Sequence, residues 1–437
     1  MEQFRRRYTW DMGNRLLVAR DEITGRVARY DYDEFDNLIS AEYERGGEVE
    51  RLYRVPDRMG NLFELREKDD RKYDAGGRLA EDREFFYHYD CEGNLVFKEF
   101  KEMVLRGGIV APINKEQLET ELGIRFRAFG TGWRYDWQSD GMLARVVRPD
   151  GKEVLFAYDA LGRRIRKTYA GTTTHFVWDG NVPLHEWTEE AEESMVTWLF
   201  EQDTFVPAAK LVANGECFSI ISDYLGTPLQ AYDKEGNKVW EQELDIYGRQ
   251  RKRPSSFIPF KYQGQYEDGE TRLYYNRFRY YDPNAGSYIS QDPIGLVGEN
   301  PTLYSHVKSP NSQLDLLGLD VYALVATHDG WYPVYEYGTK DPIAYTKLNK
   351  GDVYKIGETQ HPKTRYSQAR LDEARINRSK ATAVTFDADG NIIPAGVKMK
   401  PISQGGTKKA DRQLENSLLK KYNEEHGHLP AGNKHYH

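Results

Sequence analysis

A short phrase recurs along residues 10–239: an aromatic residue, Asp, two variable residues and Gly, often followed by Asn or Arg. It is written WDMGNRLL from Trp10, YDAGGRLA from Tyr73, YDCEGNLV from Tyr89, YDALGRRI from Tyr158 and YDKEGNKV from Tyr232, with looser copies at Tyr32, Pro56 and Tyr135. In such a phrase Asp can accept hydrogen bonds from backbone amides, and Gly tolerates a positive φ. Alternating stretches such as EVLFAYD flank the turns, as in β-strands. The phrase therefore predicts a series of β-hairpins.

Repetition of the hairpin predicts the larger architecture. One hairpin cannot bury its apolar face alone, so we expect the hairpins to stack into one long curled sheet over residues 1–275. The 31 Tyr residues, against 18 Phe, suit strands that are half buried, because the ring is apolar and the hydroxyl is polar. Residues 106–132 break the period, and we interpret them as an insertion with a short helix at 115–122.

Length and composition exclude several classes of protein. A chain of 437 residues can bury a sizeable core and form more than one domain. Cys91 and Cys217 are far apart and neither lies in a CxxC pair, which predicts two free, packed thiols. No run approaches the roughly 18 apolar residues of a membrane span, and no signal peptide is visible.

Charge divides the sequence near residue 319. Residues 320–437 carry 18 Lys and Arg against 14 Asp and Glu, a net of +4, whereas the upstream residues carry 43 against 55, a net of −12. A basic domain behind an acidic body indicates a nucleic-acid partner, although a solvated surface explains +4 equally well.

Two nearly identical phrases, DPIGL from Asp292 and DLLGL from Asp315, lie just before this division. Two carboxylates brought together cannot both ionise easily, so one remains protonated. Such a pair supplies an acid and a base, which can cut a peptide bond through water. The glycines would let the backbone fold tightly enough for the acids to meet. The alternative is that both phrases are ordinary turns.

The repeats together with DYLGTP, DIYGR, RFRYYDPNAGSYISQDPIGL and DLLGLD resemble an Rhs (YD-repeat) protein over about residues 8–319. The resemblance implies a repeat shell that encloses a variable C-terminal toxin, with residues 276–319 as its closing segment. It also implies self-cleavage by Asp292 and Asp315 between Leu319 and Asp320. The family usually has Pro in the second phrase, where Leu316 stands here.

Downstream the repeat stops, and residues 320–437 predict a small α+β domain. VYALVAT, WYPVYEYG, PIAYTKL, GDVYKIGET, TAVTFDADG and IIPAGVKMK favour short strands. Residues 363–378 favour a helix, and residues 408–427 favour another, with an apolar stripe and Gly427 at the C-cap position.

Motifs in this domain resemble a divergent GIY-YIG nuclease over about residues 331–434: PVYEYG, VYKIGET, then Arg365, Glu415 and Asn433. The resemblance implies that Glu415 binds one Mg²⁺ (or Mn²⁺) and that Arg365 clamps the scissile phosphate. Tyr335 would orient or deprotonate the attacking water, and Asn433 would support the site.

The second motif departs from the family, because the tyrosine of VYKIG stands one place early. Either Tyr354 reaches the site through a local bulge, or Lys355 replaces it as base or phosphate contact. Each of these residues also has a structural alternative, since Tyr335 and Tyr354 could pack a sheet and Glu415 could be a surface acid.

The leading hypothesis is an Rhs-type antibacterial effector whose released tail hydrolyses nucleic acid, with DNA favoured over RNA. The family suggests type VI delivery into a target-cell cytoplasm, a spike or adaptor partner and an immunity protein. Two alternatives remain: a toxin with other tail chemistry (a metal-independent RNase or a nucleotide-modifying transferase), or a YD-repeat adhesin or binding scaffold.

Overall fold

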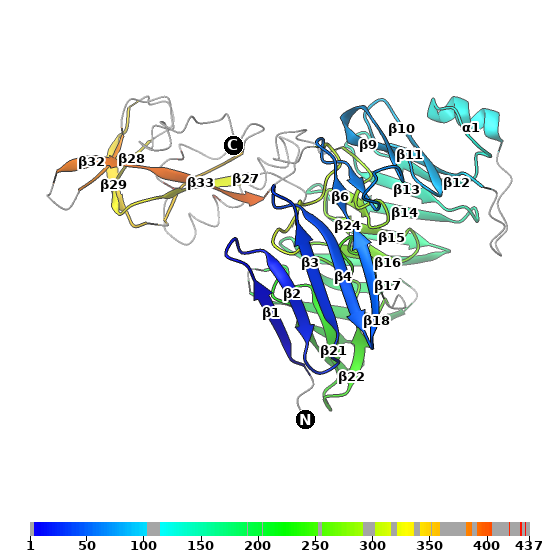
Figure 1. The fold of residues 1–437 in the computed structure, drawn as a ribbon, viewed down its shortest axis with the longest axis horizontal. Helices are drawn as coiled ribbons and strands as arrows, with labels where there is room; N and C mark the ends of the chain where they lie inside the picture. Colours follow the sequence, from blue (N-terminus) through cyan, green and yellow to red (C-terminus); the bar gives the residue numbers. More distant parts are fainter. Residues whose placement is uncertain are drawn as a thin grey trace. The chain divides into compact units, whose positions relative to one another are not determined.

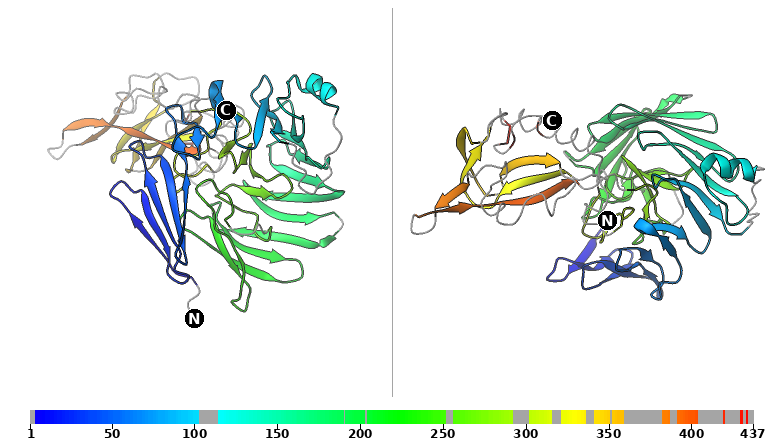
Figure 2. Two further views of the ribbon diagram at one scale, coloured as in Figure 1. Left: turned by 45° about the vertical axis from the view of Figure 1, so that its right-hand side comes forward. Right: turned by 90° about the horizontal axis from the view of Figure 1, so that it is seen from above.

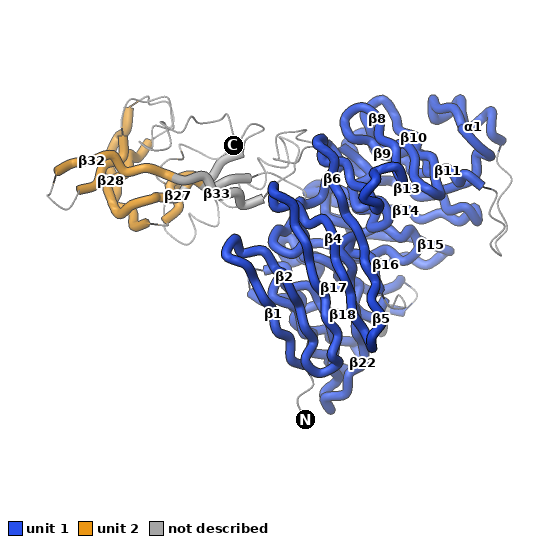
Figure 3. The backbone as a smooth tube through the Cα atoms, in the orientation of Figure 1, with its two compact units in different colours: residues 1–291, 300–316 blue, residues 292–299, 317–437 orange. Residues whose placement is uncertain are grey.

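The computed structural model describes residues 4–102, 114–189, 191–202, 204–251, 256–291, 302–315, 321–335, 341–350, 352–358, 382–386, 391–403, 419, 429–430 and 433. The chain divides into two compact units (Figure 3). Unit 1 comprises Met1–Gln291 and Asn300–Leu316, and unit 2 comprises Asp292–Glu299 and Leu317–His437. The predicted domain boundaries at residues 275 and 319 stay predictions.

Unit 1 is built from antiparallel sheets whose strands follow one another in chain order (Figure 1). A five-stranded sheet contains β1 (Arg6–Trp10), β2 (Leu16–Asp21), β3 (Val27–Tyr32), β4 (Leu38–Arg45) and β5 (Glu48–Tyr53), and a hairpin of β6 (Val55–Pro56) and β7 (Leu62–Phe63) follows. The prediction of a mostly β fold made of stacked hairpins is confirmed, but the prediction of one long sheet over residues 1–275 was wrong, because the hairpins divide among separate sheets.

A fifteen-stranded sheet forms most of unit 1 and is called the long sheet below. It consists of β8 (Lys72–Asp74), β9 (Arg78–Glu81), β10 (Phe85–Tyr89), β11 (Leu95–Phe100), β12 (Gly132–Trp137), β13 (Leu143–Val147), β14 (Glu153–Tyr158), β15 (Arg164–Tyr169), β16 (Thr172–Asp179), β17 (Val182–Thr188), β18 (Ala191–Phe200), β19 (Pro207–Val212), β20 (Cys217–Ser222), β21 (Pro228–Tyr232) and β22 (Lys238–Glu241). Each strand pairs with the next one along the chain, so the hairpin repeat generates the sheet directly.

The turn at Asp90 shows why the phrase needs its residues. Asp90 Oδ1 accepts hydrogen bonds from the amides of Glu92 and Asn94, at 3.0 and 2.8 Å. The Asn94 side chain donates to Asp90 Oδ2 at 3.1 Å, and Gly93 adopts a φ of +83°. The same bond from the fifth residue's amide to the Asp side chain occurs at Asp11, Asp33, Asp57, Asp159, Asp223, Asp233 and Asp245.

The aromatic residue of the phrase joins neighbouring hairpins. Tyr89 Oη donates to the carbonyl of Leu79, 3.0 Å away, and Leu79 is the residue that leaves the preceding turn. The equivalent bonds are Tyr32 to Leu16, Tyr73 to Leu62, Trp137 to Leu95, Tyr158 to Leu143 and Trp178 to Arg164. Because Phe has no donor, this bond accounts for Tyr and Trp at the position.

Two copies of the phrase depart from the predicted turn. In YDWQSDGML, Asp136 lies in β12 and pairs with Arg134 and Arg145. The turn there begins at Gln138, whose amide donates to the carbonyl of Met142. In YDAGGRLA, the 3₁₀ turn η1 (Ala75–Gly77) follows Asp74, whose side chain makes no capping bond. The prediction that Asp136 caps its turn was wrong, because the turn begins two residues later than the phrase suggests.

A small sheet of β23 (Tyr266–Asp268), β24 (Leu273–Asn276), β25 (Arg279–Asp282) and β26 (Ser287–Tyr288) lies inside the curve of the long sheet (Figure 2). One face packs into the main core, where Leu273, Tyr275 and Tyr280 meet Leu95, Leu143 and Val154 of the long sheet. Buried ion pairs join the two sheets: Lys98 Nζ lies 2.8 Å from Asp282, and Arg164 lies 2.5 Å from Asp268.

The predicted helix in the insertion is confirmed as α1 (Lys115–Leu122), with Asn114 as N-cap and Gly123 as C-cap at a φ of +66°. The buried Glu99 carboxylate accepts the amides of Arg127, Ala128 and Gly130, which fastens the segment after α1 to β11. β12 then pairs with β11, so the long sheet continues across the insertion.

Cys91 and Cys217 are free, as expected, but both are exposed, so the prediction of packed thiols was wrong. Cys91 occupies a variable position of a YD turn, which faces solvent, and Cys217 begins β20. No helix in the described part of the chain is long and apolar enough to cross a membrane.

Unit 2 contains two antiparallel sheets. β27 (Val321–Ala326) lies between β30 (Val353–Glu358) and β33 (Val397–Ser403), and the second sheet has the order β29 (Ala344–Leu348), β28 (Gly330–Val334), β31 (Ala383–Phe386), β32 (Ile392–Ala395). The six predicted strand segments are confirmed. The predicted helices at 363–378 and 408–427 lie outside the described residues, apart from Leu419, which is helical.

Candidate functional site

The second face of the small sheet in unit 1 holds one predicted site residue, Asp315. Asn276 on β24 pairs with Arg279 on β25, and Tyr281 on β25 pairs with Tyr288 on β26. Because side chains alternate along a strand, Asn276, Arg279 and Tyr288 share a face, opposite to the face that joins the main core. All three are at most 2% exposed.

Three side chains of the described residues bind Asp315. Tyr288 Oη donates to the Asp315 carboxylate at 2.7 Å, and Arg279 Nη2 lies 3.1 Å from the same oxygen. Asn276 Nδ2 donates to the Asp315 backbone carbonyl at 2.9 Å and to Tyr288 Oη at 2.7 Å. The carboxylate is therefore fixed at its charged group and through its own backbone.

The surroundings of this network set its charge state. Burial and the charge of Asp315 raise the pKa of Tyr288 well above its usual value, so the phenol remains a neutral donor. The Arg279 guanidinium lies 3.7 Å above the Tyr288 ring. His306, whose ring is 5.8 Å from that of Tyr288, is fully enclosed. Burial, Arg54 and Arg279 lower the pKa of His306 to about 3, so it is neutral at physiological pH.

This arrangement favours an ionised Asp315. A guanidinium and a phenol donor both stabilise the negative form of a carboxylate. An ionised carboxylate next to a second, protonated acid can act as the base of a peptide hydrolysis. Asp292, Leu319 and Asp320 lie outside the described residues, so the predicted pairing of Asp292 with Asp315 stays a prediction.

In unit 2, Tyr354 lies at a β-bulge of the kind anticipated for VYKIG. Lys355 pairs with Leu324 and Val353 pairs with Val325, so Tyr354 is the extra residue of β30. The bulge places Tyr354 in the core of unit 2, with no exposed surface, beside Tyr332 at a ring separation of 5.5 Å. Its hydroxyl donates to the carbonyl of Pro333 at 3.1 Å.

The other tail candidates lie on separate elements. Tyr335 follows β28 and is 3% exposed, Lys355 is half buried in β30, and Asn433 is 5% exposed with its amide bonded to the Pro430 carbonyl. β28 and β30 belong to different sheets, and the strand that pairs with β30 is β27, which places Tyr322 opposite Gly357. Arg365 and Glu415 lie outside the described residues, and the roles of all six residues stay predictions.

No group of three or more His, Cys, Asp or Glu side chains within the described residues is arranged to hold a metal ion. Since Glu415 falls outside that part of the chain, the predicted Mg²⁺ site is untested.

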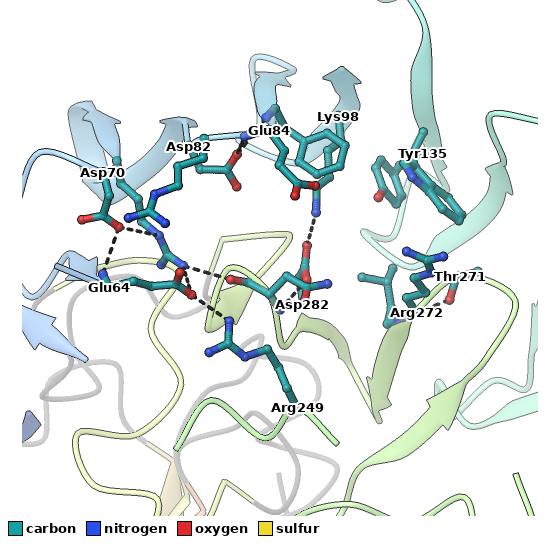
Figure 4. A pocket seen from close by; sticks show the side chains of 16 residues that line it. Glu64, Asp70, Asp82, Glu84, Lys98, Tyr135, Arg249, Thr271, Arg272 and Asp282 are labelled. Atoms are coloured by element: carbon teal, nitrogen blue, oxygen red, sulfur yellow. Dashed lines mark hydrogen bonds and ion pairs between the residues drawn. The ribbon is translucent and has the colours of Figure 1, made fainter. Parts of the chain in front are cut away.

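A pocket of about 240 Å³ in unit 1 has a different character (Figure 4). Its lining carries both signs of charge, and most of these charges are paired. Arg71 binds Glu64 and the carbonyl of Asn284, and Arg249 binds Glu64 at 2.8 Å. Such pairing joins the β6–β7 region to the turn after β25. No predicted site residue lines this pocket, and we interpret it as a structural junction.

Sequence reasoning missed Asn276, Arg279 and Tyr288. The signal for Asn276 and Arg279 is present in YYNRFRYYDP, where Asn and Arg interrupt a segment that is otherwise aromatic, and Tyr288 follows it in GSYIS. Polar side chains in a strand buried on both faces need partners, so they point to a buried polar site.

Comparisons with known proteins locate the repeat region. The family model described as the teneurin YD-shell matches residues 126–304. The probable deoxyribonuclease RhsB of Dickeya dadantii is 30% identical over 289 residues, which are 63% of this chain and 18% of RhsB. The double-stranded DNA deaminase toxin A of Burkholderia cenocepacia is 28% identical over 357 residues, 72% of this chain and 22% of the toxin. This chain thus spans about a fifth of each of these two relatives.

Two further matches are a solved structure and a shorter relative. Among solved structures, the TcdB2–TccC3 complex aligns with 71% of this chain and 20% of its own chain, at 19% identity and a TM-score of 0.38. YibJ of Escherichia coli K12, an uncharacterised protein, is 40% identical over 172 residues, which are 39% of this chain and 67% of YibJ. Together with the YD turns and the closing phrases, the family-model and sequence matches show that the chain belongs to the Rhs (YD-repeat) family.

Proposed function

We propose that this chain is part of an Rhs-type effector that cuts itself between Leu319 and Asp320 and so releases a tail that acts on nucleic acid. The observation that carries the self-cleavage is the buried network in which Tyr288 and Arg279 hold the carboxylate of Asp315, 23 positions after Asp292. Arg279 and Tyr288 offset the cost of burying this carboxylate, and they hold it in one position, as a base that must meet a particular peptide bond requires.

In the proposed reaction Asp315 is the base and Asp292 the acid. Asp315 takes a proton from a water molecule, whose oxygen adds to the carbonyl carbon of Leu319. Asp292 donates its proton to the amide nitrogen of Asp320, and the bond between the two residues breaks. Arg279 is a positioning residue in this scheme, since it acts through Asp315. Leu316 in place of the usual Pro leaves the backbone before the cut less restricted in φ, which we expect to slow the reaction.

The proposed substrate of the tail is nucleic acid, with DNA favoured. Two relatives support this class by name, one as a deoxyribonuclease and one as a DNA deaminase, and the tail carries a net charge of +4. By the family resemblance, Glu415 would hold Mg²⁺ or Mn²⁺ and Arg365 would bind the scissile phosphate, with Tyr335, Lys355 and Asn433 around them. A bound divalent cation would stabilise charge on the reacting phosphate.

Tyr354 has a weaker case than Lys355 within this proposal. Its hydroxyl is bonded to Pro333 and its ring has no exposed surface. Lys355 is half buried and follows the bulge, so it is the candidate base or phosphate contact of the second motif.

The proposed biological setting follows the family. Delivery by a type VI apparatus would require a spike or adaptor partner, and the producing cell would need an immunity protein. We propose the target-cell cytoplasm as the site of action.

The test uses the full chain, as wild type and Glu415→Ala, with plasmid DNA and total RNA, in Mg²⁺ and in EDTA. Glu424→Ala is a matched control, since it removes an acid from the same predicted helix. We expect Mg²⁺-dependent DNA nicking that Glu415→Ala abolishes and Glu424→Ala retains.

Other outcomes select the alternatives. RNA degradation in EDTA would indicate a metal-independent RNase. Intact nucleic acids together with loss of viability in expressing cells would indicate a nucleotide-modifying transferase or another toxin. A chain that damages nothing would favour the adhesin or binding scaffold.

A further inference from the structure

One face of the four-stranded sheet in unit 2 is lined by aromatic and aliphatic side chains that point to solvent. The register pairs Trp331 with Lys347 on one side and with Val384 on the other, and Phe386 with Ile392. Tyr345, two residues from Lys347, lies on the same face. We call this set the aromatic face: Trp331, Tyr345, Lys347, Val384, Phe386, Ile392.

The opposite face of the sheet already supplies the core of unit 2. Tyr332, Ala383 and Ala395 on that face have no exposed surface, and Leu348 is 8% exposed. On the aromatic face, Trp331 and Tyr345 are each 44% exposed, Phe386 is 58% exposed and Ile392 is 68% exposed. Among the described residues, the core of unit 2 forms on the opposite face, and the exposed rings of the aromatic face take no part in it.

The three rings form a line across the sheet. Tyr345 is on β29, Trp331 on the adjacent β28 and Phe386 on the next strand, β31, each one diagonal step from its neighbour. Diagonal neighbours in a sheet have Cα atoms about 7–8 Å apart. Some four-stranded sheets stack two or three unpaired bases on aromatic side chains of their strands, and the three rings offer a surface of this kind.

The charge beside the rings favours a polyanion over an apolar protein. Lys347 is exposed directly opposite Trp331, and Lys350 is exposed two residues after β29 ends. None of the described strand residues on this face is Asp or Glu. A stacked base needs a ring below it and a cation near its phosphate, and the aromatic face supplies both.

We propose that the aromatic face binds single-stranded nucleic acid, with bases stacked on Tyr345, Trp331 and Phe386 and the backbone near Lys347. This inference rests on the proposed function for the class of ligand and specifies its single-stranded form. In a tail that cuts nucleic acid, such a face would hold the strand while the reacting phosphate lies elsewhere in unit 2.

The test is a binding titration of the full chain in EDTA, so that metal-dependent cleavage does not interfere. The probes are fluorescein-labelled oligo(dT) and oligo(U) of about twelve nucleotides and a DNA duplex of the same length, followed by fluorescence anisotropy. We expect both single strands to bind more tightly than the duplex. Trp331→Ala, Tyr345→Ala and Phe386→Ala should each raise the Kd by about 5-fold or more.

Two variants separate stacking from a general effect on the sheet. Trp331→Phe keeps a ring and should retain most of the affinity. Ile393→Ala removes an apolar side chain, 39% exposed, from the opposite face of β32 and should leave the Kd unchanged. An unchanged urea transition for every variant checks that the chain is folded.

The outcomes distinguish this inference from the proposed function. The inference about the aromatic face fails if the chain does not bind single strands, or if the three alanine variants do not change the Kd. This holds even if the wild type cuts DNA. If binding depends on the rings but no nucleic acid is cut, the inference about the aromatic face is supported and the proposed nuclease activity is contradicted. If Trp331→Ala instead converts a dimer to a monomer in light scattering, a second copy covers the face and the inference fails.

Discussion

The long sheet of unit 1 and the four-stranded sheet of unit 2 place the same types of aromatic residue, Tyr and Trp, in different surroundings. In the long sheet, Tyr89 and Trp137 donate to backbone carbonyls of the preceding hairpin, so the polar atom of each ring fastens the sheet. In unit 2, Tyr332 also donates to a backbone carbonyl, that of Gly396, but its neighbour Trp331 faces solvent. A one-residue difference in register thus separates a structural aromatic residue from a candidate binding residue.

The largest predicted effect is a loss of stability when the buried ion pair between the long sheet and the small sheet is removed. Arg164 is 1% exposed, pairs with the fully buried Asp268, and lies 4.5–5.5 Å from four aromatic rings. Arg164→Ala leaves Asp268 with less compensation in a buried site, so we expect a loss of about 3–5 kcal/mol in the free energy of unfolding, measured by urea denaturation.

Arg163→Ala, one residue earlier, is the matched control. Arg163 pairs with Asp159 at a turn, with its side chain 25% exposed. We expect a loss of about 1 kcal/mol or less, as for other solvent-accessible pairs. Equal losses for the two variants would show that the small sheet does not fasten the long one.

The next effect is a dependence on pH. Because burial, Arg54 and Arg279 lower the pKa of His306 to about 3, the folded chain keeps it neutral while an unfolded chain protonates it below about pH 6.5. The stability that His306 contributes is therefore present above about pH 6.5 and is lost as the pH falls towards 3. Between pH 7 and pH 5 we expect the wild type to lose about 2 kcal/mol more than His306→Gln does.

Urea titrations of both proteins at these two pH values measure this difference. The charged and titratable groups around His306 are Arg54, Arg279, Tyr262, Tyr281 and Tyr288. If the two proteins lose the same stability, His306 titrates normally in the folded state, and the cationic surroundings assigned to Asp315 are wrong.

The smallest effect compares the two regions directly. Tyr89→Phe removes the donor to the Leu79 carbonyl, so we expect a loss of about 1–2 kcal/mol. Tyr345→Phe in the aromatic face removes an exposed hydroxyl and should change stability by less than about 0.5 kcal/mol. Losses of similar size, from urea transitions of the full chain, would remove the distinction between the two uses of tyrosine.

The sequence predicts local structure well where a turn carries its own signal. The Asp and Gly of each YD phrase encode the hairpin, so the long sheet follows from the repeat. Asp136 shows the limit of this prediction. The phrase is present there, but Gln138 and Gly141 form the turn, so it lies further along the chain than the phrase predicts. Helix α1 was predictable because its cap residues, Asn114 and Gly123, lie at its two ends.

The sites were less predictable because they depend on contacts between distant segments. Asp315 could be recognised from its repeated phrase, but Arg279 and Tyr288 join it only through the fold of the small sheet. In unit 2, the bulge at Tyr354 decides which way that ring points, and no residue type encodes it. The aromatic face could not be predicted from the sequence, because only the strand order places Tyr345, Trp331 and Phe386 on three adjacent strands.

The measurement that tests the central claim most directly is a time course of the full chain after purification, by gel and intact mass, for wild type, Asp315→Asn and Asp292→Asn. The account predicts that the wild type separates into residues 1–319 and 320–437, and that both variants stay intact. Arg279→Gln should slow the cut without abolishing it, because Arg279 acts through Asp315. A wild type that stays whole, or an Asp315→Asn chain that is cut at the same rate, would contradict the role assigned to Asp315.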